Sequence, residues 1–177
     1  MLSYKDRCVP AQLPALIRIL PSIEILSPNA EEALSLLSVF EPPSKSLIEE
    51  ACHRFLDIGV GPEGKGTVII RSGSMGAYIA SRTRAGQWVP AFWGAEDARK
   101  VVDVTGAGNA FLGGLAAGLH FTGNDVFKAV LYATQGISVA EQNRRKAQTH
   151  LQLLLMILQY ILDLRREGVK SQSLIDV

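Results

Sequence analysis

The sequence predicts an α/β fold in which a mostly parallel sheet is flanked by helices. Short apolar runs rich in β-branched residues, such as TVII at 67–70, alternate with segments whose apolar residues recur every three or four positions. That alternation is typical of parallel strands joined by crossover helices. The length of 177 residues suits one domain with a sizeable core. A single α/β domain is therefore expected.

Turn residues set the expected boundaries of the elements. Ser27-Pro28 ends the first apolar run, Pro42-Pro43 separates two helical patterns, and a glycine-rich loop precedes TVII. Strands are expected at 23–26, 67–73 and 101–104, and helices at 29–40, 44–60, 110–121 and 124–142, the last opened by an asparagine cap. Residues 76–93 have the pattern of a short hairpin with exposed arginines, and 143–177 that of a basic-flanked amphipathic helix.

Composition excludes several classes of protein. Lys and Arg number 18 against 17 Asp and Glu, so charge gives no reason to expect nucleic acid or an anionic membrane as the main partner. The apolar run 151–162 is shorter than the roughly 20 residues that span a bilayer. Two cysteines cannot build a disulfide framework, and early prolines interrupt any secretory signal. A cytoplasmic location is expected.

The segment DVTGAGNAFLGG, residues 103–114, carries the strongest chemical signal. Gly106, Ala107 and Gly108 stand directly before a helical run, so their backbone N–H groups could hold an anion at the helix start. The alternative is structural, because glycines also recur within the helix at 113, 114 and 118 and would permit close packing. From these residues alone both interpretations stay open.

The segment SPNAEEA also admits two interpretations. Asn29 followed three residues later by Glu32 has the spacing of a capping box at a helix start. Alternatively, Glu32 at the end of a sheet strand organises water around a magnesium ion that accompanies nucleotide phosphates. No P-loop, dinucleotide fingerprint, nucleophile elbow or clustered histidine set is present in the sequence.

Taken together, residues 23–142 resemble the ribokinase/PfkB carbohydrate kinase family. DVTGAGNAFLGG looks like the family's Asp-Thr-x-Gly-Ala-Gly-Asp signature, PNAEEA like its Asn-x-x-Glu motif, and VIIRSGSMGAYI like the segment that borders the nucleotide. The resemblance implies a ribokinase-like fold and the cofactors ATP and Mg. More narrowly, the GAGN spelling resembles a fungal branch of kinase-like proteins linked to maintenance of double-stranded RNA virus particles.

The resemblance also implies roles for particular residues. The backbone of Gly106, Ala107 and Gly108 would form the anion hole for the transferring phosphoryl group, and Asp103 would support that turn. Asn29 and Glu32 would organise phosphate and magnesium, with Glu32 acting through water. Gly73 would lie against the nucleotide, the helix 125–141 would border the adenine, and Arg71 stands where the family commonly has threonine.

Two departures from the family pattern bear on activity. Asn109 stands where the family has its catalytic Asp, and an amide cannot take a proton from a sugar hydroxyl. Nothing before residue 23 resembles the family's sugar-binding half and lid, so 1–142 looks like the C-terminal, nucleotide-binding portion of a kinase domain, followed by a separate helix at 143–177.

Two functions are therefore expected from different classes. In the first, phosphotransfer from ATP to a sugar or nucleoside hydroxyl is weak or lost. In the second, the chain is a noncatalytic kinase-fold scaffold. Self-association is expected through the C-terminal helix or an exposed sheet edge.

Overall fold

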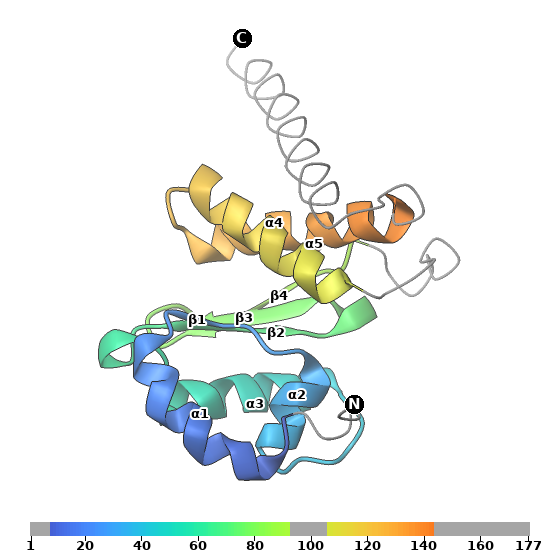
Figure 1. Ribbon diagram of the computed structural model, residues 1–177. Coiled ribbons are helices and arrows are strands. Elements are labelled where there is room, and N and C mark those ends of the chain that lie inside the picture. Colours follow the sequence, from blue (N-terminus) through green and yellow to red (C-terminus); the bar gives the residue numbers. More distant parts are fainter. Residues whose placement is uncertain (1–7, 93–105, 144–177) are drawn as a thin grey trace. The chain divides into compact units, whose positions relative to one another are not determined.

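The structure, a computed structural model, describes residues 8–92 and 106–143, with side chains described as far as residue 135 in the second range. The chain divides into two compact units, Met1–Pro90 and Ala91–Val177 (Figure 1). The helix expected at 143–177 and the strand expected at 101–104 lie outside the described residues.

The first unit is a sheet with helices on one face (Figure 1). Its strands are β1 (Ile25–Leu26), β2 (Thr67–Arg71), β3 (Ala77–Ser81) and β4 (Gln87–Val89). Its helices are α1 (Leu13–Ile19), α2 (Ala30–Leu36) and α3 (Lys45–Ile58), with short 3-10 helices η2 (Pro10–Gln12), η3 (Leu20–Ser22), η4 (Pro62–Gly64) and η5 (Gly73–Met75). The expected strands at 23–26 and 67–73 and the helices at 29–40 and 44–60 are confirmed, with shorter bounds.

The sheet is mixed, in the order β1-β2-β3-β4. β1 pairs parallel to β2, whereas β2 with β3 and β3 with β4 are antiparallel. The expectation of mostly parallel pairing is therefore wrong for these strands. Gly73 and Gly76, at φ +56° and +93°, close the connection between β2 and β3 within a few residues, and a parallel connection needs a dozen or more. The expected hairpin at 76–93 is confirmed as β3 and β4.

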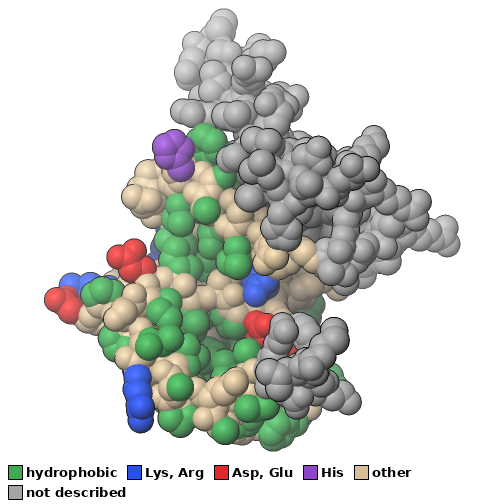
Figure 2. All heavy atoms as spheres, viewed as in Figure 1, with side chains coloured by type: hydrophobic (Ala, Val, Ile, Leu, Met, Phe, Trp, Pro, Cys, Tyr) green, Lys and Arg blue, Asp and Glu red, His purple; other side chains and the backbone are tan. Residues whose placement is uncertain are grey.

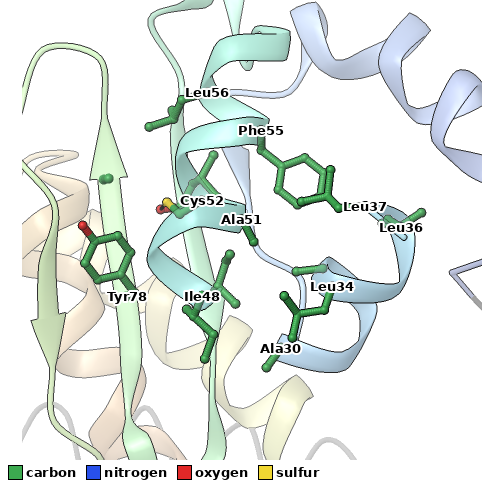
Figure 3. Close-up of a cluster of buried hydrophobic side chains, with 14 of the residues drawn as sticks. Ala30, Leu34, Leu36, Leu37, Ile48, Ala51, Cys52, Phe55, Leu56 and Tyr78 are labelled. Carbon is green, nitrogen blue, oxygen red and sulfur yellow. Dashed lines mark hydrogen bonds between the residues drawn. The ribbon is translucent and has the colours of Figure 1, made fainter. Parts of the chain in front are cut away.

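The core of this unit lies between α3 and the sheet (Figure 3). The buried face of α3 consists of residues spaced three and four apart, namely Ile48, Ala51, Cys52, Phe55 and Leu56. They pack with alternate residues of the strands, Val68 and Ile70 from β2 and Tyr78 and Ala80 from β3. Residues spaced three and four apart on the helix and two apart on the strands thus form one cluster of buried side chains.

α1 precedes the first element that the sequence predicts. Pro14 occupies its first turn, where the missing N–H has no helical partner in any case, so proline is tolerated there. Leu20, just beyond α1, is fully buried, and its carbonyl accepts a hydrogen bond of 2.9 Å from Gly61 N. The prolines that argue against a signal sequence are therefore compatible with a short packed helix.

The second unit pairs α4 (Ala107–Phe121) with α5 (Val126–Asn143). A Cβ atom on Gly114 would lie 2.8 Å from Tyr132 O, and one on Gly118 would lie 2.7 Å from Ala129 O. Only glycine permits so close an approach of two helix backbones. The structural interpretation of these two glycines, close helix packing, is confirmed.

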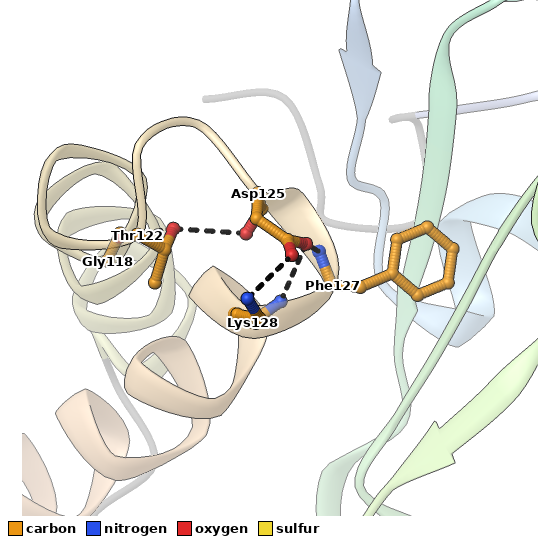
Figure 4. A network of polar contacts seen from close by, with 5 residues as sticks. All are labelled: Gly118, Thr122, Asp125, Phe127 and Lys128. Carbon is orange, nitrogen blue, oxygen red and sulfur yellow. Dashed lines mark hydrogen bonds and ion pairs between the residues drawn. The ribbon is translucent and has the colours of Figure 1, made fainter.

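The turn between α4 and α5 is held by a small polar network (Figure 4). Asp125 Oδ1 accepts hydrogen bonds from the N–H groups of Phe127 and Lys128, at 3.1 and 3.2 Å. The Thr122 hydroxyl lies 2.8 Å from Gly118 O and 3.1 Å from Asp125 O. The expected asparagine cap is wrong: Asn124 sits in the left-handed region at φ +67°, and its neighbour Asp125 caps α5.

Large apolar side chains reach the surface of the described parts. Phe40, between α2 and α3, is 78% exposed, and Ile17 and Ile19 of α1 are also exposed. Figure 2 shows hydrophobic side chains over much of the face drawn, with few charged groups among them. Within the described ranges, no helix is long and apolar enough to cross a membrane.

The contact between α4 and α5 predicts the effect of adding one methyl group. Gly118→Ala should lower the free energy of unfolding by about 1–3 kcal/mol, because its Cβ would collide with backbone that cannot rotate away. Urea unfolding followed by circular dichroism measures the change. Ala116→Ser, at an exposed position of α4, is the matched control and should stay within about 0.5 kcal/mol. Equal stability of both variants would contradict the packing described.

Cys52 predicts a pH dependence of stability. Burial raises the pKa of its thiol from 9.0 to about 12, and a backbone hydrogen bond at Ala80 offsets part of that rise. Because only the unfolded chain ionises between these values, the contribution of Cys52 is present below pH 9.0 and is lost as the pH rises toward about 12. The slope from this group is about 1.4 kcal/mol per pH unit.

Cys52→Ala should remove this slope. The measurement is the difference in unfolding free energy between wild type and variant from about pH 8 to about pH 11. The difference should shrink with rising pH. A constant difference would contradict the shifted pKa of the buried thiol.

Candidate functional site

Among the described residues, no side chain caps the start of α4. Gly106 is the N-cap residue in the left-handed conformation, φ +89° and ψ −6°, and as a glycine it has no side chain to cap the helix. A Cβ on Gly106 would meet no atom within 4 Å, so it is the backbone conformation that favours glycine. The N–H groups of Ala107, Gly108 and Asn109 precede the first intrahelical donor, Ala110, which bonds Gly106 O at 2.9 Å. These amides can bind an anion.

Asn109 lies in the first turn of α4 and is exposed. Its side chain is a neutral amide that can donate and accept hydrogen bonds but cannot act as a general base at neutral pH. Asp103, the carboxylate nearest to it along the chain in the N-terminal direction, lies outside the described residues. Residues 106–109 therefore offer backbone donors and an amide, and none of these four carries a proton-accepting side chain.

Asn29 and Glu32 form a complete capping box at the start of α2. Glu32 N donates to Asn29 Oδ1 at 2.8 Å, and Asn29 N donates to Glu32 Oε2 at 2.9 Å. Asn29 has extended dihedrals, φ −81° and ψ 170°, as a cap residue requires. The structural interpretation of this segment is confirmed. The carboxylate of Glu32 is used to satisfy the backbone that leads into the helix.

Arg71, the last residue of β2, adds a cation to this arrangement. Its backbone N–H donates to Pro28 O at 3.0 Å, and its side-chain Nε donates to Ser27 O at 3.3 Å. Its Nη2 lies 3.9 Å from Glu32 Oε2, with the two side chains 19% and 32% exposed. An ion pair that is partly withdrawn from water is screened less than one at the surface. Arg71 thus faces the same carboxylate oxygen that closes the capping box.

A magnesium ion bound directly to Glu32 Oε2 fits poorly here. Mg²⁺ binds through carboxylate oxygens and several ordered waters in near-octahedral geometry. Glu32 Oε2 already accepts from Asn29 N, and the guanidinium of Arg71 places a positive charge beside it. In the described ranges no group of three or more His, Cys, Asp or Glu could hold a metal ion. These contacts bear on direct coordination, and the magnesium that the family resemblance implies, held by Glu32 through water, stays a prediction.

Gly73 begins η5, immediately beyond β2. It is exposed, its φ is +56°, and a Cβ there would meet no atom within 4 Å. The turn closes through a hydrogen bond of 2.7 Å from Ser72 N to Gly76 O. The open backbone at Gly73 allows a flat group to approach closely, which is what contact with a nucleotide would need.

The predicted site residues fall into two sets. Asn29, Glu32 and Arg71 are brought together in the first unit, and Gly106, Ala107, Gly108 and Asn109 form the start of α4 in the second. Sequence reasoning did not connect Arg71 with Glu32. The available signal was Arg71, a cation at the end of an apolar strand and two positions before Gly73. The helix expected to border the adenine is α5, which runs to Asn143.

The chain belongs to the pfkB family of carbohydrate kinases, whose family model matches residues 3–145. An uncharacterized protein of Schizosaccharomyces pombe is 29% identical over 162 residues, which are 81% of this chain and 43% of that protein. Protein MAK32 of Saccharomyces cerevisiae is 38% identical over 104 residues, 55% of this chain and 28% of that protein. Both relatives are fungal, and the chain spans less than half the length of each.

Solved structures confirm the ribokinase-like fold. The structure of Arabidopsis thaliana ribokinase complexed with ribose and ATP matches with a TM-score of 0.59 at 24% identity, over 80% of this chain and 43% of that chain. At this level of identity the likeness concerns the fold. The described part corresponds to a portion of a longer kinase fold, with a mixed sheet and helices.

The capping box predicts a stability change at Asn29. Asn29→Ala should lower the free energy of unfolding by about 1 kcal/mol, because the N–H of Glu32 loses its acceptor. Asn29→Asp retains the accepting oxygen and serves as the matched control. Thermal unfolding of both variants against wild type measures the effect, and an unchanged alanine variant would contradict the structural role of the box.

Proposed function

We propose that this chain binds the phosphates of ATP through the backbone N–H groups at the start of α4. The observation that carries the proposal is the glycine-opened helix start at Gly106–Asn109, which no side chain of the described residues caps. Such ends attract anions because unpaired amides and the helix dipole act together. Membership of the pfkB family supports a nucleotide as the anion, since the related ribokinase of Arabidopsis thaliana is described with ribose and ATP.

The reaction proposed is transfer of the ATP γ-phosphate to a sugar or nucleoside hydroxyl, at a rate that Asn109 makes weak or zero. Loss of a general base typically costs about 100- to 10,000-fold. Phosphoryl transfer depends mainly on positioning and charge stabilisation, so backbone donors without a base can still support slow turnover. Mg²⁺ enters this proposal only as the counter-ion that nucleotides carry in solution. The cytoplasmic location stays a prediction.

A second candidate function is a noncatalytic kinase-fold scaffold. The exposed amide of Asn109 at the position of the family's base favours it, because the fold persists without that carboxylate. Self-association through 151–162 or through a sheet edge would then be the main activity, and 151–162 lies outside the described residues. A folded chain that binds no nucleotide would favour this candidate over the first.

ATP binding is tested first by calorimetry on the purified chain. We expect saturable binding of ATP and ADP in the presence of Mg²⁺, because both nucleotides end in phosphates that the α4 amides can hold. Gly108→Val should weaken binding at least about tenfold, since a branched side chain would stand among the donors. Ala116→Ser, on the same helix but away from its start, should bind as wild type does. Binding that survives Gly108→Val unchanged would show that α4 does not hold the phosphates.

Asn109→Asp tests the missing base. In a chain that also carries the family's sugar-binding half, the variant should raise phosphotransfer by about 100-fold or more, because a carboxylate can accept the hydroxyl proton. Coupled measurement of ADP release with a sugar acceptor reports turnover. Asn109→Ser, which adds no base, should show no such gain. An unchanged rate for Asn109→Asp would refute the role given to position 109.

A further inference from the structure

The start of α4, where phosphate binding is proposed, has no lysine or arginine close to it within the described range 106–143. α4 itself contains neither residue type. In α5 the only such residue is Lys128, whose Nζ lies 3.4 Å from Asp125 Oδ2 beside the turn that joins the two helices (Figure 4). ATP carries several negative charges, and a helix start supplies only about half of one positive charge. Lysine, arginine or a metal ion usually completes such sites.

The antiparallel packing of α4 and α5 places the end of α5 beside the start of α4. A Cβ on Gly118 would lie 2.7 Å from Ala129 O, and one on Gly114 would lie 2.8 Å from Tyr132 O. With an equal rise per residue in both helices, Gly106 is level with about residue 140, and α5 continues to Asn143. Figure 1 shows the start of α4 and the end of α5 at the same end of the helix pair.

The sequence continues from Asn143 with a basic cluster, Arg144, Arg145 and Lys146. These three residues lie outside the described range. Consecutive Cα atoms are about 3.8 Å apart, so chain connectivity alone brings Arg144 to the end of α5. No other run of three basic residues occurs in the sequence. The first cations after α5 therefore follow the helix end that lies beside the start of α4.

We propose that the basic cluster supplies the positive charge for phosphates bound at the start of α4. This inference rests on the nucleotide binding proposed above. The first amides of α4 contribute directional hydrogen-bond donors, and the basic cluster contributes charge. Arginine suits this role because its guanidinium donates paired hydrogen bonds to phosphate oxygens and is always protonated. Affinity should therefore rise from AMP to ADP to ATP, since each added phosphate adds negative charge.

Basic residues after a helix also have a purely structural use. Cations near a helix C-terminus stabilise the helix through its dipole, and this role needs no ligand. It predicts that removing the charges lowers stability without a specific loss of phosphate affinity. Affinity and stability measured on the same variants therefore separate the two roles.

The first experiment is calorimetry on the full chain with ATP and with inorganic tripolyphosphate, which carries phosphates without a nucleoside. Arg144→Ala/Arg145→Ala should lose at least about tenfold in affinity for both ligands. Arg144→Lys/Arg145→Lys retains the charge and should stay within about threefold of wild type. Arg165→Ala/Arg166→Ala removes the same charge elsewhere in 143–177 and is the matched control, which should bind both ligands as wild type does.

The second experiment repeats these titrations at low and at high salt. Salt screens charge interactions, so wild-type affinity should fall more steeply with salt than the affinity of Arg144→Ala/Arg145→Ala. Equal salt dependence of the two would overturn the role of the basic cluster. Urea unfolding of each variant, followed by circular dichroism, shows that it is folded under the titration conditions. A loss of stability with unchanged affinity would support the structural role instead and overturn the proposal.

The outcomes separate this inference from the proposed function. If Gly108→Val abolishes ATP binding while Arg144→Ala/Arg145→Ala binds as wild type does, the proposed function stands and the inference is overturned. If the double alanine variant loses tripolyphosphate while Gly108→Val binds it normally, the basic cluster holds phosphates and the function proposed for α4 fails. An equal loss in Arg165→Ala/Arg166→Ala would overturn the inference, because charge at any position would then suffice. Wild type that binds neither ligand overturns both.

Discussion

The pairing between the ends of β1 and β2 is the interaction on which the first unit depends. Arg71 N bonds Pro28 O, and the bridge between Asn29 and Arg71 continues the parallel ladder beyond β1, which is only two residues long. This pairing sets where the chain turns into α2, and hence where the capping box forms. It also delivers the Arg71 side chain to Glu32. The carboxylate of Glu32 therefore takes part both in the local capping of α2 and in a contact that depends on the pairing of distant strands.

The second unit needs glycine for two purposes, the start of α4 and its contact with α5. Gly106 adopts a left-handed conformation at the start of α4, where no side chain of the described residues caps the first amides. Gly114 and Gly118 permit α4 and α5 to approach at backbone distance. Because the same helix uses glycine both for its start and for its packing, the chemical and structural interpretations of this segment are compatible. They concern different residues.

Much of the fold could be predicted from the sequence because its signals are local. The three-and-four spacing around Phe55 gives α3, and the β-branched run ending at Arg71 gives β2. Long-range features could not be predicted this way. The antiparallel hairpin after Gly73 depends on which strands pair, and the cap of α5 depends on which of two adjacent polar residues takes the left-handed conformation. Contact between Glu32 and Arg71 requires knowing that β1 and β2 are neighbours.

The capping box also bears on what the Asn-x-x-Glu motif indicates about catalysis. Asn29 and Glu32 stabilise a helix start whether or not a nucleotide is bound, so selection for folding alone is enough to retain them. The side chain at position 109 is exposed, so a substitution there has little structural cost. The Asn-x-x-Glu spelling is therefore explained by folding alone, and its presence is a weak indicator of catalysis.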